Sequence, residues 1–301
     1  NSRAQQSMKL LLHALITYAA TALIAPHPRI KPLKITKTTT QQLTPFENAI
    51  TVNTALAAFG IGTRQKSLTP SGLAHAWALG VILLSSFVGW RGYSLCVLYL
   101  VAGSAATKVK QAEKDAAGIG EGRGGRRGPE NVWGSAATGA ACALLGQAYP
   151  AQRPLLAVAY VASLATKLSD TLASEIGKAY GKTCYLSTTL KRVPPGTEGA
   201  VSLEGTLAGV AGSLVIAGYA TAVGLVAPAM VPVAAVAAFV ATTCESWLGA
   251  TLQGGIFTNE VINFINTLIG AVVAAALVAA RHNVARLYAR DAAIVGLAER
   301  C

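Results

Sequence analysis

Residues 166–209, TKLSDTLASEIGKAYGKTCYLSTTLKRVPPGTEGAVSLEGTLAG, place a dense group of polar side chains beside long apolar runs. The stretch continues the run RPLLAVAYVASLA (153–165), which predicts one long helix. At about 100° per residue, its first polar residues share a helix face roughly 140° wide. They are Lys167, Asp170, Thr171, Ser174, Glu175 and Lys178. Gly181 is placed to end this helix. Charges beside a membrane helix are costly to keep, so this face is the first candidate for function.

The composition is that of an integral membrane protein. Of the 301 residues, 52% are hydrophobic and 13% are charged, and the mean hydropathy is +0.47. A soluble domain carries about a quarter charged residues. We therefore predict an all-α, polytopic bundle of about six to eight transmembrane helices, because one span needs about 20 residues. The apolar segments lie near residues 47–62, 71–89, 92–107, 131–149, 153–176, 202–225, 229–252 and 260–280.

Three regions of the chain differ in composition. Residues 1–46 are basic and contain no acidic residue, which resembles the tail of an organelle transit region. Residues 47–280 form the predicted membrane domain, and residues 281–301 a basic C-terminal tail. Within the membrane domain, pairs such as Gly205 and Gly209 favour close helix packing.

The net charge of +12 indicates an anionic partner or surface. In an arrangement of eight spans, the basic loops 108–130 and 178–201 share one side, which predicts the inner side of the membrane. The basic residues are not interleaved with aromatic ones, so we predict no nucleic-acid binding. The five cysteines form no CxxC pair, and we predict neither a zinc site nor a disulfide framework.

Residues 123–128, RGGRRG, combine three arginines with three glycines. Arginine grips phosphate in a bidentate fashion, and glycine lets backbone amides approach an anion. Arg126 and Arg127 are therefore predicted phosphate ligands, although a loop that only sets topology or binds lipid headgroups has the same composition. The other predicted substrate-binding or phosphate-binding residues are Lys178, Lys182, Lys191, Thr197, Glu198, Ser202, Glu204, Glu245 and Gln253.

Asp170 and Glu175 are predicted to hold Mg²⁺, which prefers one or two carboxylates together with phosphate oxygens. With Lys167 they form our predicted catalytic group. The alternative is a pair of structural ion pairs, Asp170 with Lys167 and Glu175 with Lys178. No GxxxxGK[ST] motif is present, which excludes a P-loop kinase.

Five motifs resemble the integral-membrane family of the plastid phytyl-phosphate kinases of tocopherol synthesis. They are GSAATKVK (103–110), GRRGPENVWGSAA (125–137), TKLSDTLASEIGKAYGKT (166–183), PPGTEGAVSLEGTLAG (194–209) and ESWLGATLQ (245–253). The resemblance implies a kinase that converts phytyl phosphate, derived from salvaged phytol, to phytyl diphosphate for tocopherol and prenylquinone synthesis. It also implies a multi-pass protein of a chloroplast membrane, envelope or thylakoid.

A fainter likeness of residues 170–182 and 196–199 to membrane polyprenol kinases implies CTP as the phosphoryl donor. The expected partners are thus a prenyl-phosphate lipid, a nucleoside triphosphate and the membrane, with association with other plastid membrane proteins left open. A lipid-phosphate carrier or a non-catalytic membrane subunit would carry a similar polar face. The sequence shows no convincing internal repeat of the kind that carriers often have.

Overall fold

The computed structural model describes residues 43–252 and 257–298. The chain divides into two units between Lys66 and Ser67. In the first unit, α2 (Pro45–Gly62) begins at a capping box formed by Thr44 and Glu47. This box satisfies two of the backbone amides that a helix leaves free at its start.

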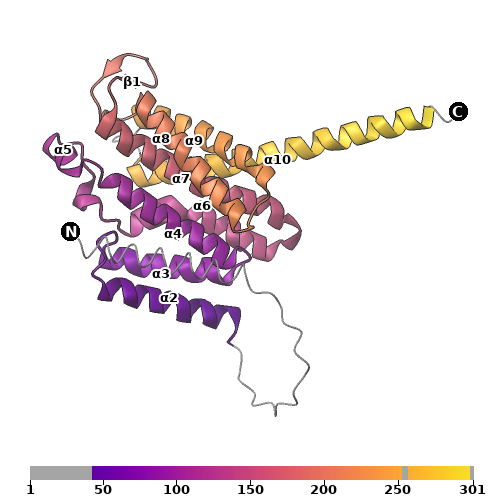
Figure 1. Cartoon of the computed structure of the whole chain (residues 1–301), viewed down its shortest axis with the longest axis horizontal. Coiled ribbons are helices and arrows are strands. Elements are labelled where there is room, and N and C mark those ends of the chain that lie inside the picture. The colour runs from indigo at the N-terminus through magenta and orange to yellow at the C-terminus, as the bar shows by residue number, and fades with distance from the viewer. Residues whose placement is uncertain (1–42, 253–256, 299–301) are drawn as a thin grey trace, which may run out of the picture. The chain divides into compact units, whose positions relative to one another are not determined.

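The second unit is a bundle of helices with a small sheet (Figure 1). Its main helices are α3 (Pro70–Ser85), α4 (Gly89–Thr107), α6 (Pro129–Ala148), α7 (Arg153–Tyr180), α8 (Leu203–Ala222), α9 (Val231–Leu252) and α10 (Asn259–Ala298). The shorter elements are α5 (Gln111–Ala116), η1 (Gly122–Gly125), η2 (Pro150–Gln152), η3 (Pro228–Met230), β1 (Cys184–Leu186), β2 (Arg192–Val193) and β3 (Ala200–Ser202).

Helix α7 is the centre of this bundle. It packs against α4, α6, α8, α9 and α10, and its residues 157–170 are buried on every side. Glycines on α8 let its backbone approach α7 closely: a Cβ at Gly205 would lie 2.5 Å from the carbonyl oxygen of Ala173. One at Gly209 would lie 3.0 Å from that of Ser169. The packing role expected for these glycines is therefore confirmed.

The predicted helices all form, with ends within a few residues of the expected ones, apart from the longer α10. Gly181 caps α7 as predicted. Helix α10 continues to Ala298, so most of the predicted basic tail extends the last helix. The segment expected as a plain loop after α7 instead contains an antiparallel sheet in the order β2-β1-β3, with Cys184 opposite both Val193 and Ser202.

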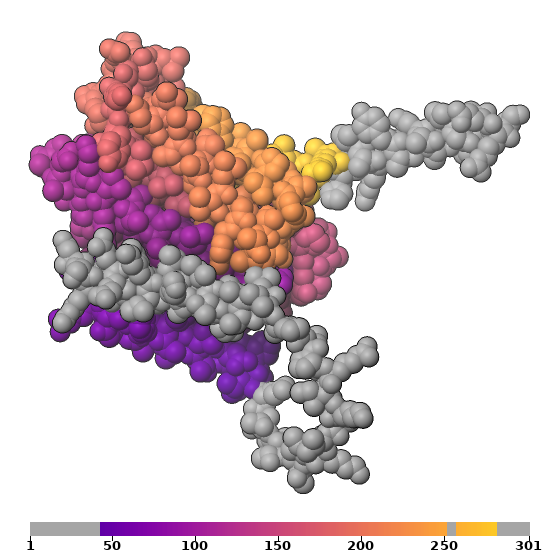
Figure 2. Space-filling view, viewed as in Figure 1, coloured from indigo at the N-terminus to yellow at the C-terminus, as the bar shows by residue number. Residues whose placement is uncertain are grey.

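Within the described residues, four helices are long and apolar enough to cross a membrane: residues 150–180, 203–222, 228–251 and 259–281. Small and weakly polar residues lower the hydropathy of α4 and α6, and α3 is shorter. The predicted count of six to eight spans is thus not confirmed. Helix α9, orange in Figure 2, has the exposed apolar side chains Val236 and Val240, as expected of a helix that faces lipid.

The polar segments meet at one end of the bundle. The amide of Thr69 before α3 donates to the carbonyl oxygen of Arg127 before α6, at 3.0 Å. Lys178 at the end of α7 lies 3.5 Å from Glu121 in the loop after α5. Helices α3, α6, α8 and α10 thus begin at the end where α4, α7 and α9 finish. The predicted convergence of the polar motifs is confirmed.

Candidate functional site

A polar cavity of about 810 Å³ opens where these helix ends meet. Its walls come from α4, α6, α7, α8, α9 and α10, and its rim from the loop 118–127 and the sheet region. The volume falls in the range of pockets that enclose a substrate the size of a nucleotide. Every member of the predicted polar face of α7 lines it.

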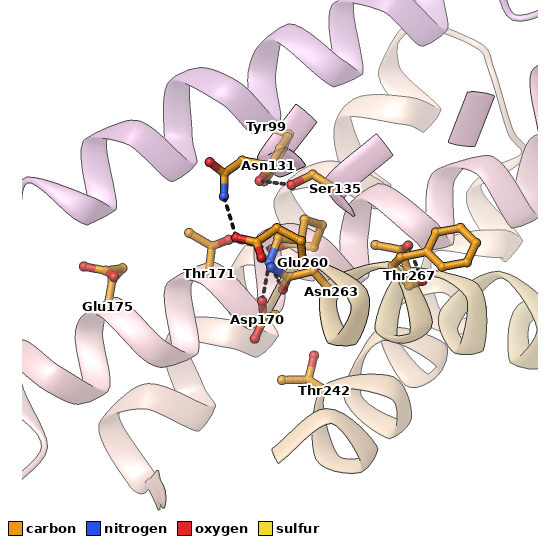
Figure 3. A network of polar contacts seen from close by, with 12 residues as sticks. Tyr99, Asn131, Ser135, Asp170, Thr171, Glu175, Thr242, Glu260, Asn263 and Thr267 are labelled. Atoms are coloured by element: carbon orange, nitrogen blue, oxygen red, sulfur yellow. Dashed lines mark hydrogen bonds and ion pairs between the residues drawn. The ribbon is translucent and has the colours of Figure 1, made fainter. Parts of the chain in front are cut away.

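A buried ion pair forms part of the cavity wall, and Figure 3 shows its acid, Asp170, within the polar network. Lys167 Nζ donates to Asp170 Oδ2 at 2.6 Å and to Asn263 Oδ1 of α10 at 2.5 Å. Glu245, from α9, lines the same cavity and lies close enough to Asp170 and Lys167 for electrostatic interaction with both. Two acids therefore share one ammonium group, an arrangement suited to binding additional positive charge.

A second polar group lines the cavity on the side of α4 and α6. Tyr99 and Ser135 share a hydrogen bond of 3.0 Å between their hydroxyl oxygens. The guanidinium of Arg127 donates to the Tyr99 hydroxyl and stacks over its ring, 4.9 Å from the centroid. Asn131 Nδ2 donates to Glu260 Oε1 at 3.4 Å and so joins α6 to α10 (Figure 3).

The glycine-rich loop forms part of the rim. Arg123, Gly124 and Gly125 all have positive φ, at 56°, 61° and 75°. A Cβ at Gly125 would lie 2.7 Å from Thr107 Cγ2, so glycine is required there for both conformation and space. Arg123 pairs with Glu130 and lowers the pKa of that carboxyl group below its usual value. Arg126 is exposed and lines the cavity.

Glu175 is held in a different way from Asp170. It pairs with Lys114 of α5, whose Nζ also donates to the carbonyl oxygen of Thr107 at 2.9 Å. Both side chains are 2% exposed. Lys178 lies 3.9 Å away on the outer side of the same carboxylate. This clamp fastens α5 and the end of α4 to α7.

The family described as integral membrane protein DUF92 matches residues 53–271. The chain belongs to this family. An uncharacterized membrane protein of Synechocystis is 53% identical over 233 residues, which are 76% of this chain and 90% of that protein. The chloroplastic protein VTE6 of Arabidopsis thaliana is 43% identical over 239 residues, with 76% and 71% covered. No solved structure gives a significant match.

Membership of the DUF92 family confirms the family assigned from the five sequence motifs, all of which fall inside the matched range. These motifs also form most of the cavity wall. The structure brings together the predicted residues Lys167, Asp170, Glu175, Lys178, Arg126, Arg127, Thr197, Glu198, Ser202 and Glu245. Ser202 also caps α8 by accepting a hydrogen bond from the amide of Gly205 at 3.1 Å.

Three predicted residues of this DUF92 protein are not in the cavity wall. Lys182 and Lys191 are exposed, and Glu204 is half-buried in the first turn of α8. The β1–β3 sheet, which the sequence reading missed, changes the course of the chain around the two lysines. Gln253 lies outside the described residues.

Several residues of the site were not predicted from the sequence. Tyr99 lies within an apolar run, and Glu260 and Asn131 begin helices, where polar residues are common. Lys114 is the partner of Glu175, for which only Lys178 was considered. Asn259 and Asn263 could have been predicted to belong to the site, because their spacing of four residues places both polar side chains on one helix face.

Asp170 and Glu175, the two predicted Mg²⁺ ligands, are held apart in the structure. Among the described residues, no group of three or more His, Cys, Asp or Glu side chains could hold a metal ion. Asp170 and Glu175 have separate partners, and Figure 3 shows them apart along α7. The acid that interacts electrostatically with Asp170 across the cavity is Glu245 of α9. Two carboxylates are enough for Mg²⁺ when phosphate oxygens complete its ligands.

Proposed function

We propose that this protein transfers a phosphoryl group from a nucleoside triphosphate to a prenyl monophosphate. The observation that carries the proposal is that one polar cavity is lined both by two acids inside the bundle, Asp170 and Glu245, and by arginines at its rim. Phosphoryl transfer needs such an arrangement, because two anionic reactants must be held together and their charge offset. The similarity to VTE6 and the resemblance to phytyl-phosphate kinases make phytyl phosphate our proposed acceptor.

In the proposed reaction, an oxygen of the acceptor monophosphate forms a bond to the γ-phosphorus of the donor. The bond between that phosphorus and the β,γ-bridging oxygen breaks, and the nucleoside diphosphate leaves. The acceptor oxygen is already anionic, so no general base is needed and positioning dominates. Arg126 and Lys178 at the rim suit the donor phosphates, and Arg127 suits the acceptor.

Asp170 and Glu245 fit a Mg²⁺ ion better than Asp170 and Glu175 do, because these two acids interact electrostatically across the cavity. When bound, the ion would offset the charge of the donor phosphates. Lys167 lies against the same acid and limits repulsion between the carboxylates. We keep CTP as the proposed donor, on the faint likeness to polyprenol kinases.

The product, phytyl diphosphate, would feed tocopherol and prenylquinone synthesis, and we propose a chloroplast membrane as the location. The chloroplastic relative supports this location but does not distinguish envelope from thylakoid. A lipid-phosphate carrier or a non-catalytic subunit is the competing function.

The test uses the full chain purified into lipid nanodiscs with phytyl phosphate, Mg²⁺ and each γ-labelled nucleoside triphosphate in turn. We expect label in phytyl diphosphate, fastest with CTP. Label transfer to phytyl phosphate with any donor supports a kinase. Binding of phytyl phosphate without label transfer from any donor would favour the carrier or subunit.

A further inference from the structure

A small apolar cavity of about 80 Å³ lies between α3, α4 and α6. Its walls include Leu79 and Leu83 from α3, Val97 and Leu100 from α4, and Val132 and Ala136 from α6. The mechanism proposed above does not use this space. Its position matters because it adjoins the polar cavity.

Four residues line both cavities: Tyr99, Arg127, Asn131 and Ser135. Figure 3 shows Tyr99, Asn131 and Ser135 grouped on one side of the polar network. The apolar cavity and the polar cavity thus adjoin at these four residues, which form a polar junction between them.

Arg127 at this junction lacks a counter-ion: within the described ranges, no carboxylate lies within ion-pair distance of it. Its guanidinium stacks on Tyr99 and packs against α4 at Gly103, where a Cβ would lie 2.7 Å from Arg127 Nη2. The stacking fixes the guanidinium while leaving donors for an anion. An anionic group bound here would have polar space on one side and apolar space on the other.

We propose that Arg127 holds the monophosphate of the prenyl substrate and that the apolar cavity receives the methyl branch of the isoprene unit next to it. This inference rests on the proposed function for the identity of the lipid. A soluble anion would leave the apolar space unused, and a neutral lipid would leave Arg127 unpaired. An amphiphile with an anionic head matches both halves.

The volume limits how much of the chain enters. A cavity of about 150 Å³ holds one benzene molecule. The 80 Å³ found here is about half of that volume, so it accepts roughly three carbon atoms: the methyl branch and the carbons that bear it. The rest of the chain continues past the half-buried Ala76 and Val97 of the same cavity wall. The selected feature is therefore the methyl branch beside the phosphate, and not total chain length.

The test is a binding titration without nucleotide, on the full chain in nanodiscs, with phytyl phosphate and unbranched hexadecyl phosphate as probes. Ala136→Leu and Ala76→Leu fill the cavity from two helices. Ala141→Leu, at an exposed site on α6, is the matched control. We expect the cavity-filling variants to raise the Kd for phytyl phosphate about tenfold and that for hexadecyl phosphate much less. The control should bind both as the wild type does.

Arg127→Gln tests the junction, with free phytol as the third probe. We expect weaker binding of both phosphates and unchanged binding of phytol. Equal effects of Ala136→Leu or Ala76→Leu on branched and unbranched phosphates, or none, would overturn the cavity assignment. Wild-type binding of phytyl phosphate without phosphorylation would remove the proposed kinase and leave this inference standing. Normal phosphorylation with an unchanged Kd for phytyl phosphate in both cavity-filling variants would remove this inference and leave the proposed kinase standing.

Discussion

Two buried carboxylates lie five residues apart on α7 and are held in opposite ways. Glu175 is enclosed by Lys114 and Lys178, which come from α5 and α7. Asp170 pairs with Lys167, which also donates to Asn263, and it faces the second acid Glu245. Two cations face Glu175, with Glu121 on the far side of Lys178, whereas a single cation serves both Asp170 and Glu245.

This difference separates a structural ion pair from a reactive site. A carboxylate with two cationic neighbours has no need of a metal ion and serves to join helices. A carboxylate that shares one cation with another acid gains from binding a further cation. From the sequence, Asp170 and Glu175 carry the same prediction. From their surroundings we propose that Asp170 serves the chemistry and Glu175 the assembly of the bundle.

The largest expected effect is that of Asp170→Asn. The amide keeps the size of the side chain and can accept from Lys167, which also retains Asn263 as an acceptor. The variant should therefore fold, while label transfer falls on the order of a thousandfold because the charge that balances Mg²⁺ is lost. Label transfer in nanodiscs and thermal unfolding of the same sample measure both effects.

The double variant Asp170→Asn with Lys167→Met is its control. It removes the buried ammonium together with its partner, so stability should match or exceed that of the single variant. Activity should not return. An active and stable double variant would assign Asp170 to structure and end the distinction between the two carboxylates.

Glu175→Gln should show the converse pattern. It leaves Lys114 with a neutral amide and the carbonyl oxygen of Thr107 as acceptors, whereas Lys167 keeps the acid Glu245 nearby in Asp170→Asn. Breaking a buried pair on one side costs about 3–5 kcal/mol. The unfolding temperature should fall, while activity per folded molecule stays within a few-fold of the wild type. Adding Lys114→Met should recover most of the stability. A large loss of activity at full stability would instead make Glu175 part of the reactive site.

The fold was largely predictable because each helix is a long apolar run between glycine, proline or charged residues. Helix α7 shows this well: its apolar run, its polar face and the stop at Gly181 were all read correctly. The sheet was not predictable, since β1 and β3 have three residues each and pair across 18 positions of the chain, Cys184 to Ser202. Such short strands carry no alternation long enough to recognise.

The site was predictable along one helix and not between helices. The polar face of α7 follows from helical spacing alone. The partners of that face do not, because Lys114 and Asn263 reach it only through the packing of α5 and α10. The pairing of Glu175 with Lys178 was therefore only part of the clamp. Tyr99, placed in an apolar run, gave no sign that it would stack beneath an arginine.

The smallest expected effect extends the same comparison to two arginines of the rim. Arg123 pairs with Glu130 and donates a hydrogen bond to Asn131 Oδ1 at 2.9 Å. Arg126 is exposed in the cavity wall and has no carboxylate partner among the described residues. A lysine cannot reproduce the bidentate grip of a guanidinium on phosphate. Arg126→Lys should therefore raise the KM for the nucleotide about tenfold, the cost of one good charged hydrogen bond. Arg123→Lys keeps a charge beside Glu130 and should change the KM less than about twofold, since exposed ion pairs contribute little.

Steady-state kinetics of both variants in nanodiscs make the comparison. Equal KM values for Arg126→Lys and the wild type would return this loop to a role in topology alone, and a larger effect at Arg123 would exchange the roles of the two arginines.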